Sequence, residues 1–267
     1  MYEHPLAYCR RATVWIVTRE LAVAMEAAKK AAELALRHQP NIVAETKPDQ
    51  SPVTQADREC EQLIARMLTE AFPEDGVFGE EGARAETRSG RRWIIDPIDG
   101  TRDYVRGNQL WANLIALEKD GDVVVGVVNL PMLGKLYSAA RGGGAHCNGS
   151  IIHASSKTSV DESVLCVNGY DKVAKSPFYD RLLDWMTRFW AVRGLGGAAD
   201  AMLVASGQAE IWIEPSASPW DFAPLKMILE EAGARYLNED GGSTIYAGNG
   251  IGCAPGLEQE VRRFLHG

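Results

Sequence analysis

The spacing of apolar residues predicts two amphipathic helices in the first part of the chain. Between residues 20 and 38, one face would carry Leu21, Met25, Ala28, Ala32 and Ala35. The alanines on that face would let another element pack closely against it. A second helix is expected over residues 54 to 72, where apolar positions again recur at helical spacing: Cys60, Leu63, Ile64, Met67, Leu68 and Phe72.

Later segments have the sequence pattern of β-strands. Apolar runs predict strands at residues 93–95, 114–117, 123–128 and 135–139. Beyond residue 151, strands expected at 164–167 and 209–213 alternate with helices expected at 177–189, 198–205 and after residue 221, a pattern typical of layered αβ structure. We therefore predict an α+β protein with an N-terminal extension over residues 1–19, a first lobe over 20–150 and a second lobe over 151–267.

The predicted strand at 93–95 runs directly into an acidic turn. Asp96 arrives at the strand end, where a carboxylate is costly to desolvate unless a cation or several donors compensate it. Pro97 is expected to end the strand, and the turn can then direct Asp96, Asp99 and the Ile98 carbonyl into one cleft. Oxygen ligands gathered in this way suit a hard cation such as Mg²⁺.

Gly100 and Thr101 follow the two aspartates and would begin a helix. Free backbone N–H groups and the positive end of a helix dipole favour a phosphate at such a position. The alternative is a solvated, aspartate-rich turn, because aspartate and glycine are common in turns of every kind.

Further acidic residues decide between these alternatives. Glu80 and Glu81 lie side by side on a glycine-flanked loop, so one of them is expected to be a metal ligand. Asp221 falls in the first turn of a predicted helix, where a capping role competes with a ligand role. Thr54 and Asp57 have the spacing of a capping box, which makes Asp57 a structural residue.

A glycine-rich segment at residues 141–145 could suggest a phosphate cradle. It lacks the Lys-Ser/Thr pair that follows such a loop in P-loop proteins. Glycine runs mainly mark turns, so we expect a turn between two strands here.

Composition limits the classes of function. The formal net charge of −8 and pI near 5.2 argue against a duplex nucleic-acid binder, and no segment approaches 18 uninterrupted apolar residues, so we expect no membrane association. Five scattered cysteines without C-x-x-C spacing favour a reduced, cytoplasmic protein over a disulfide scaffold or zinc site: Cys9, Cys60, Cys147, Cys166 and Cys253.

Four motifs, in this order, resemble those of the inositol monophosphatase superfamily of metal-dependent, lithium-sensitive phosphomonoesterases. They are Ser-Pro-Val-Thr-x-Ala-Asp at 51–57, Gly-Glu-Glu at 79–81, Asp-Pro-Ile-Asp-Gly-Thr at 96–101 and Trp-Asp at 220–221. The resemblance covers about residues 20 to 265. It implies the alternating α-β-α-β-α sandwich of the inositol monophosphatase and fructose-1,6-bisphosphatase type, usually as a homodimer. Segments 101–107 and 111–117 are most similar to bacterial and plant histidinol-phosphate phosphatases.

The resemblance also implies the metal ligands. Glu80, Asp96 and the Ile98 carbonyl would hold one metal, and Asp96, Asp99 and Asp221 would hold another. Two or three Mg²⁺ ions per site are expected, with Mn²⁺ as a substitute.

Thr101 is implied to orient the attacking water, so that it forms the catalytic set with Glu80 and Asp96. In the inositol enzymes an acid just before the Val-Thr pair supports this threonine. The matching position here is Ser51, with Asp49 two residues upstream, and both are candidates for that part.

The implied substrate-binding residues are Asp99, Arg193, Gly197, Glu214 and Asp221. Glu214 corresponds to the acid that contacts the inositol or amino-alcohol group in relatives, and the alternative is a solvated acid at a strand end. Similar histidinol-phosphate phosphatases usually carry aspartate where Gly197 stands, so one partner for a cationic group is lost here.

Two classes of function follow. The first is a Mg²⁺-dependent phosphomonoesterase acting on a small-molecule phosphate ester, since bound cations can neutralise the phosphate dianion and activate water. Histidinol phosphate ranks ahead of inositol 1-phosphate, and a sugar or nucleotide phosphate comes third. The second class is a non-catalytic regulatory binding protein, and the presence of every metal carboxylate favours the enzyme.

Overall fold

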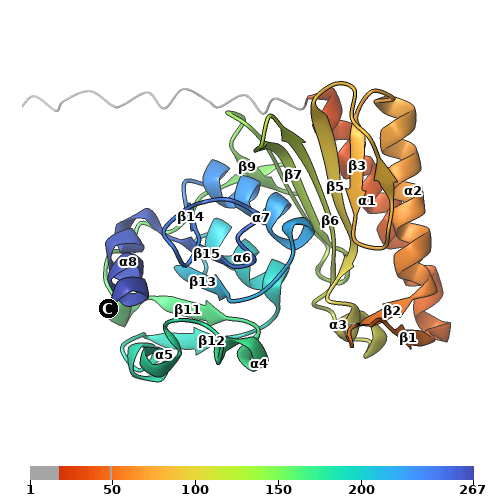
Figure 1. Cartoon of the computed structure of the whole chain (residues 1–267). Helices are drawn as coiled ribbons and strands as arrows, with labels where there is room; N and C mark the ends of the chain where they lie inside the picture. The colour runs from red at the N-terminus through yellow and green to blue at the C-terminus, as the bar shows by residue number, and fades with distance from the viewer. Residues whose placement is uncertain (1–17, 49) are drawn as a thin grey trace, which may run out of the picture.

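The computed structural model describes residues 18–48 and 50–267 (Figure 1). The predicted extension over residues 1–19 lies outside the described residues except for its last two. Helix α1 (Arg19–His38) begins at residue 19, and the Thr18 hydroxyl caps it by accepting from the Leu21 N–H at 3.2 Å. Helix α2 (Gln55–Ala71) packs beside α1, and the alanine-rich face of α1 lies against other elements, as expected.

A large mixed sheet lies against these two helices. Its eight strands have the spatial order β10-β9-β8-β7-β6-β5-β3-β4, antiparallel except for the parallel pair β3 and β5. In chain order the strands are β3 (Gly76–Gly79), β4 (Arg84–Ala85), β5 (Arg91–Asp99), β6 (Ala112–Lys119), β7 (Asp122–Leu130), β8 (Lys135–Ala140), β9 (Ala145–Cys147) and β10 (Ser150–Ile152). A separate hairpin pairs β1 (Ala44–Thr46) with β2 (Pro52–Thr54), and α3 (Thr101–Val105) follows β5.

A second sheet is formed by the rest of the chain. Its five strands have the order β12-β11-β13-β15-β14. They are β11 (Val164–Val167), β12 (Ala191–Arg193), β13 (Ile211–Glu214), β14 (Arg235–Leu237) and β15 (Gly250–Cys253). The helices of this part are α4 (Tyr170–Val173), α5 (Tyr179–Met186), α6 (Gly197–Ala205), α7 (Pro219–Glu231) and α8 (Glu258–His266).

Three apolar cores join the layers. The first packs α1 and α2 on the large sheet, the second packs α6 and α7 between the two sheets, and the third packs α5 and α8 on the outer face of the five-stranded sheet. Figure 1 shows the resulting order helix, sheet, helix, sheet, helix. The predicted α-β-α-β-α sandwich is therefore confirmed.

Strand β5 corrects one expectation. Asp96 and Asp99 are three residues apart, yet their partners on β6 are only two apart, so the extra residue forms a bulge. Pro97 lies in this bulge, where a missing N–H is tolerated, and its carbonyl accepts from Asn113 Nδ2 at 2.6 Å. Proline thus bends the strand without ending it.

Two other boundaries differ from the sequence pattern. The helix expected over 177–189 is shorter, Tyr179–Met186, and the strand expected over 209–213 begins later and includes Glu214. Strand β10 pairs with β9 in the large sheet and extends two residues past the predicted lobe boundary at 150. The two-lobe division itself stays a prediction.

Candidate active site

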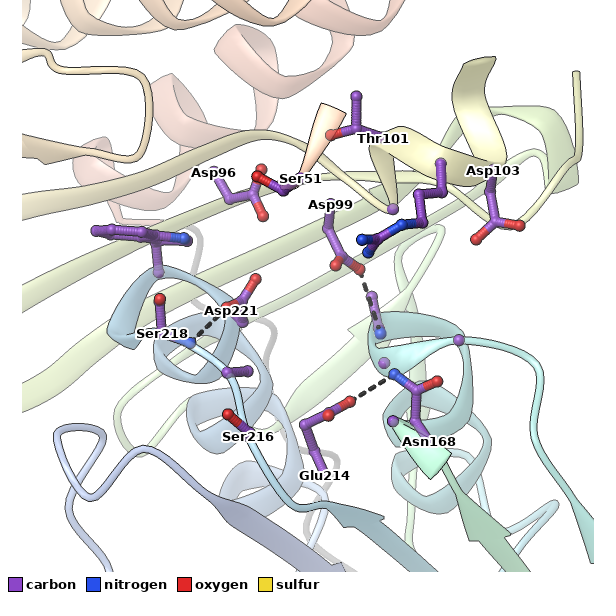
Figure 2. A pocket seen from close by; sticks show the side chains of 18 of the residues that line it. Ser51, Asp96, Asp99, Thr101, Asp103, Asn168, Glu214, Ser216, Ser218 and Asp221 are labelled. Atoms are coloured by element: carbon purple, nitrogen blue, oxygen red, sulfur yellow. Dashed lines mark hydrogen bonds between the residues drawn. The ribbon is translucent and has the colours of Figure 1, made fainter. Parts of the chain in front are cut away.

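A pocket of about 540 Å³ opens between segments of the two sheets. It is lined by the ends of β5 and β13 and by the first residues of α3, α6 and α7 (Figure 2). Most of the residues expected from the sequence lie along its wall: Glu80, Asp96, Ile98, Asp99, Gly100, Thr101, Gly197, Glu214 and Asp221.

Three aspartates converge in this pocket. One carboxylate oxygen from each of Asp96, Asp99 and Asp221 lies within 4.8 Å of the other two (Figure 2). Two come from the bulged end of β5, whereas Asp221 comes from the start of α7, where it also forms a capping box with Ser218. Backbone N–H groups orient all three: Ile98 to Asp96 at 2.9 Å, Ala198 to Asp99 at 3.3 Å, and Ser218 to Asp221 at 2.6 Å.

Glu80 approaches from the neighbouring strand. It follows β3, which runs parallel to β5, and its N–H donates to the Ile95 carbonyl at 3.0 Å. Its carboxylate interacts with that of Asp96. Lys47 Nζ lies 2.9 Å from Glu80 Oε1 and also pairs with Glu81, so one ammonium serves both acids of the loop.

Burial makes the charged form of these carboxylates unfavourable. It raises the pKa of both Asp96 and Asp99 well above the usual range, and the nearby charges of Glu80 and Asp221 respectively add to the effect. Burial also raises the pKa of Glu80 and of Asp221. Buried, mutually repelling carboxylates are the donor set that a hard divalent cation compensates, so the residues present fit Mg²⁺.

Thr101 is the first residue of α3, and Gly100 turns the chain into this helix with φ +79°. The Thr101 hydroxyl lies 3.2 Å from Asp57 Oδ1 and 3.2 Å from the Ile98 carbonyl. From the sequence, Ser51 and Asp49 were the two candidates to support the Thr101 hydroxyl. Ser51 lines the pocket and Asp49 lies outside the described residues, but the acid placed on the hydroxyl is Asp57, which was assigned only a capping role.

Glu214 forms the opposite wall. It is the last residue of β13 and only 5% exposed, so it is not a solvated strand-end acid. Asn168 Nδ2 donates to its Oε2 at 2.5 Å (Figure 2), and burial raises its pKa to about 7. Gly197 stands beside it, because an added Cβ there would lie 3.4 Å from Glu214 Oε2.

Among the residues that the structure describes, Arg193 is the one expected site residue outside this lining. It ends β12 with an exposed side chain, and its Nη1 donates to the neighbouring Val192 carbonyl at 2.8 Å. Its proposed contact with substrate stays a prediction.

The glycine-rich segment after β8 is a turn between β8 and β9, as predicted. The N–H groups of Gly142 and Gly144 each donate to the Glu231 carboxylate at 2.8 Å. The Glu231 carboxylate therefore accepts the hydrogen bonds that a phosphate would accept from a phosphate-binding loop.

The four cysteines within the described residues are free thiols, and three of them are buried; Cys9 lies outside that part of the chain. None of the helices described between residues 18 and 267 has the length and apolar character needed to cross a membrane.

Comparison with known proteins places the chain in a family. The model of the inositol monophosphatase family matches residues 17–265. A histidinol-phosphatase of Chlorobaculum parvum is 39% identical over 237 residues, 88% of this chain and 92% of that protein, and an inositol-1-monophosphatase of Mesorhizobium japonicum is 35% identical over 74% of this chain and 79% of its own length. The crystal structure of the extragenic suppressor protein suhB from Bartonella henselae superposes with a TM-score of 0.85 at 28% identity, covering 93% of this chain and 99% of that one.

The fold is that of a solved relative, and the family model covers nearly the whole chain. The chain belongs to the inositol monophosphatase family and is a phosphoric monoester hydrolase.

Proposed function

We propose that this chain is a Mg²⁺-dependent phosphomonoesterase whose first candidate substrate is histidinol phosphate. The observation that carries the proposal is the convergence of Asp96, Asp99 and Asp221 within 4.8 Å, in the pocket that also contains the buried Glu214. The proposed metal ligands stand at one wall of the pocket, and the buried carboxylate of Glu214 stands at the other. This arrangement suits a phosphate monoester that carries a cationic group at its far end.

The metal ligands in this proposal are Glu80, Asp96, the Ile98 carbonyl, Asp99 and Asp221, which would hold two or three Mg²⁺ ions or, as a substitute, Mn²⁺. Bound Mg²⁺ would supply positive charge against the phosphate dianion and lower the pKa of bound water.

The protein's own groups have separate tasks. The Thr101 hydroxyl orients the attacking water, and the N–H groups of Gly100 and Thr101 bind phosphate oxygens at the start of α3. Glu80 and Asp96 form the catalytic set together with Thr101. As metal ligands, they would help to hold the reacting groups in a fixed position relative to one another. No covalent nucleophile takes part.

Substrate selection is assigned to the second lobe. Glu214 would pair with the ammonium or imidazolium group of histidinol phosphate, with Asp99, Gly197 and Asp221 completing the surroundings; a contact from Arg193 would have to come from outside the pocket lining. The histidinol-phosphatase from Chlorobaculum parvum supports this choice. Inositol 1-phosphate is the second candidate, since Gly197 provides no additional acid for a cation and a 35% identical relative is an inositol-1-monophosphatase.

We also propose a division of labour between residues 20–150, which supply most of the metal and phosphate contacts, and residues 151–267, which supply Asp221 and the substrate contacts. The reduced cysteines support a cytoplasmic enzyme. A homodimer is proposed on the resemblance to the family.

The test is a panel of phosphate esters assayed with Mg²⁺ and with excess chelator. Histidinol phosphate should have the highest kcat/KM, and chelation should abolish turnover of every ester. Asp96→Asn should remove turnover while circular dichroism stays unchanged. Asp103→Asn is the matched control, because Asp103 also lines the pocket but bonds to Asn108 at 2.7 Å.

Each outcome has a distinct meaning. Higher kcat/KM for inositol 1-phosphate would reject histidinol phosphate as the substrate but keep the phosphatase. Full turnover with chelator, or a folded and fully active Asp96→Asn variant, would reject the metal-dependent mechanism.

A further inference from the structure

We propose that an aromatic contact between Phe78 and Trp220 holds two parts of the metal site together before the metal binds. Phe78 stands two residues before Glu80, and Trp220 directly precedes Asp221. Both are positioning residues, because they act on the metal through these neighbouring carboxylates. The inference rests on the proposed Mg²⁺-dependent phosphatase.

The two rings come from different halves of the chain. Phe78 lies in β3 of the large sheet, and Trp220 is the second residue of α7. Their ring centroids are 5.3 Å apart and their planes are inclined by 55°, which is within the range of favourable aromatic pairs. Both side chains are half-buried and pack against the core between the two sheets. The contact therefore connects a strand of the first sheet to the first turn of a helix from the second half of the chain.

Two guanidinium groups hold the ring of Phe78 in place. The Cζ atoms of Arg84 and Arg92 lie 4.4 Å and 5.2 Å from its centroid, and both distances are typical of cation–π contacts. Arg92 is itself fixed, because its Nη2 lies 2.7 Å from Glu118 Oε2 and 2.7 Å from the Tyr246 hydroxyl. The ring of Phe78 is therefore an anchored surface against which the start of α7 packs.

The direction of the chain carries this contact to the metal ligands. The Glu80 N–H donates to the Ile95 carbonyl at 3.0 Å, so the pairing of β3 with β5 continues as far as Glu80. Residues two apart along an extended segment project from the same face, and Glu80 therefore shares the face of Phe78. On the helix, a movement of Trp220 away from Phe78 would carry Asp221 away from Glu80.

Electrostatics makes such a contact useful. Burial raises the pKa of Glu80, and the nearby charge of Asp221 adds to this rise. Like charges repel, so the metal-free site favours separation of the two segments, and a helix end moves more readily than its middle. If only a fraction of the molecules has both ligands in place, the apparent Mg²⁺ dissociation constant rises by the inverse of that fraction. The aromatic contact keeps this fraction high.

Breaking the contact should weaken Mg²⁺ binding. Phe78→Leu keeps an apolar side chain but removes the ring. An aromatic pair of this kind changes an equilibrium by a factor of about 2 to 10, so we expect the Mg²⁺ dissociation constant to rise about fivefold. Trp220→Phe retains an aromatic pair and should stay within twofold of wild type.

A double-mutant cycle tests whether the two rings act through one another. Trp220→Leu breaks the same contact from the helix side and should raise the dissociation constant to a similar extent. The double variant Phe78→Leu/Trp220→Leu should bind Mg²⁺ no more weakly than the weaker of the two single variants, because one contact can be lost only once. If Phe78→Leu does not fold, the comparison of Trp220→Leu with Trp220→Phe carries the same test.

The experiment uses calorimetric Mg²⁺ titration of the full-length protein and urea denaturation of the metal-free protein. Phe178→Leu is the matched control. Phe178 is fully buried, and its ring centroid lies 5.1 Å from that of Phe264 in the core on the outer face of the five-stranded sheet. This control should lower stability at least as much as Phe78→Leu but leave the Mg²⁺ dissociation constant unchanged.

Kinetics provide a second measurement. With p-nitrophenyl phosphate, Phe78→Leu should need more Mg²⁺ for half-maximal turnover. At saturating Mg²⁺ its kcat should return to within twofold of wild type, because excess metal restores the arrangement of the ligands.

The results separate the two proposals. Wild-type protein without Mg²⁺ binding and Mg²⁺-dependent turnover overturns the proposed function, and the role of the aromatic contact falls with it. A normal wild type with unchanged Mg²⁺ affinity in Phe78→Leu and Trp220→Leu overturns the role of the contact alone. Losses that multiply in the double variant, an equal loss of affinity in Phe178→Leu, or a kcat of Phe78→Leu that stays low at saturating Mg²⁺ would overturn it as well.

Discussion

Lys47 Nζ lies 2.9 Å from Glu80 Oε1, so the acid proposed as a metal ligand has a cation of the protein beside it. Lys47 also pairs with Glu81, and these contacts raise its own pKa even though burial opposes its charge. The ammonium side chain is only 19% exposed. It therefore reduces the negative potential that would attract a divalent ion to this side of the cluster.

Removing this ammonium should strengthen metal binding. Lys47→Met keeps the length of the aliphatic stem and deletes the charge, and a partly exposed pair of this kind contributes about 1 kcal/mol. We expect roughly fivefold tighter Mg²⁺ binding by calorimetry. Lys30→Met is the control, because Lys30 pairs with Glu26 at 3.5 Å on an exposed face of α1. Weaker binding in Lys47→Met would show that the lysine organises Glu80 instead of competing for it.

The thermal stability of the metal-free protein should fall as the pH rises from about 5 to 7. Burial raises the folded-state pKa of Glu214 from its usual 4.5 to about 7, and it raises the pKa of Asp96 and Asp99 as well. Between the unfolded and folded pKa values, the folded state binds more protons, so stability is lost as these protons leave.

Added Mg²⁺ should oppose this loss, because it binds the ionised carboxylates of the folded state. The increase in Tm on adding Mg²⁺ should be larger at pH 7.5 than at pH 5, as measured by differential scanning fluorimetry. An equal increase at the two pH values would show that the carboxylate cluster is not the linked site.

Glu214 should select the organic part of the substrate without taking part in bond cleavage. Glu214→Gln should lower kcat/KM for histidinol phosphate. The loss should correspond to about 1–3 kcal/mol of transition-state stabilisation, as expected for loss of a charged hydrogen bond. Hydrolysis of p-nitrophenyl phosphate, which lacks a cationic group, should stay close to wild type. Equal losses on both substrates would assign Glu214 a structural or catalytic role.

The pH dependence offers an independent check of the same assignment. Because burial raises the pKa of Glu214 to about 7, ionisation on the alkaline side of that value should favour the cationic substrate. The ratio of kcat/KM for histidinol phosphate to that for inositol 1-phosphate should rise between pH 6 and pH 8 in the wild type. It should become flat in Glu214→Gln.

Gly126 should be needed for the close approach of α7 to the large sheet. An added Cβ at this position of β7 would lie 2.8 Å from the Pro224 carbonyl and 2.9 Å from Met227 Cβ. Gly126→Ala should destabilise the protein by about 1–3 kcal/mol, the usual cost of overpacking a core. Urea denaturation would measure this, and unchanged stability would mean that α7 can move outward freely.

The sequence alone determined the helices α1 and α2, the layered α+β class and the acidic motifs. These features are local. Helical periodicity depends on residues three and four apart, and the motif at 96–101 brings its carboxylates together through one short bulge. Strand β15 shows the limit of such patterns, because Gly250 and Gly252 give it no alternating signal. Added Cβ atoms there would meet Phe222 and Leu229 respectively, so these glycines serve the packing of α7.

Only the tertiary structure decided which distant residues share the site. The partner of Thr101 is Asp57, 44 residues away, and Lys47 reaches Glu80 across 33 residues. No local pattern encodes such pairs, because they depend on how α2 and the β1–β2 hairpin pack against the large sheet. The burial of Glu214 and the position of Arg193 outside the pocket could not be predicted from local patterns either. The exposure of a side chain depends on the layers that pack around it.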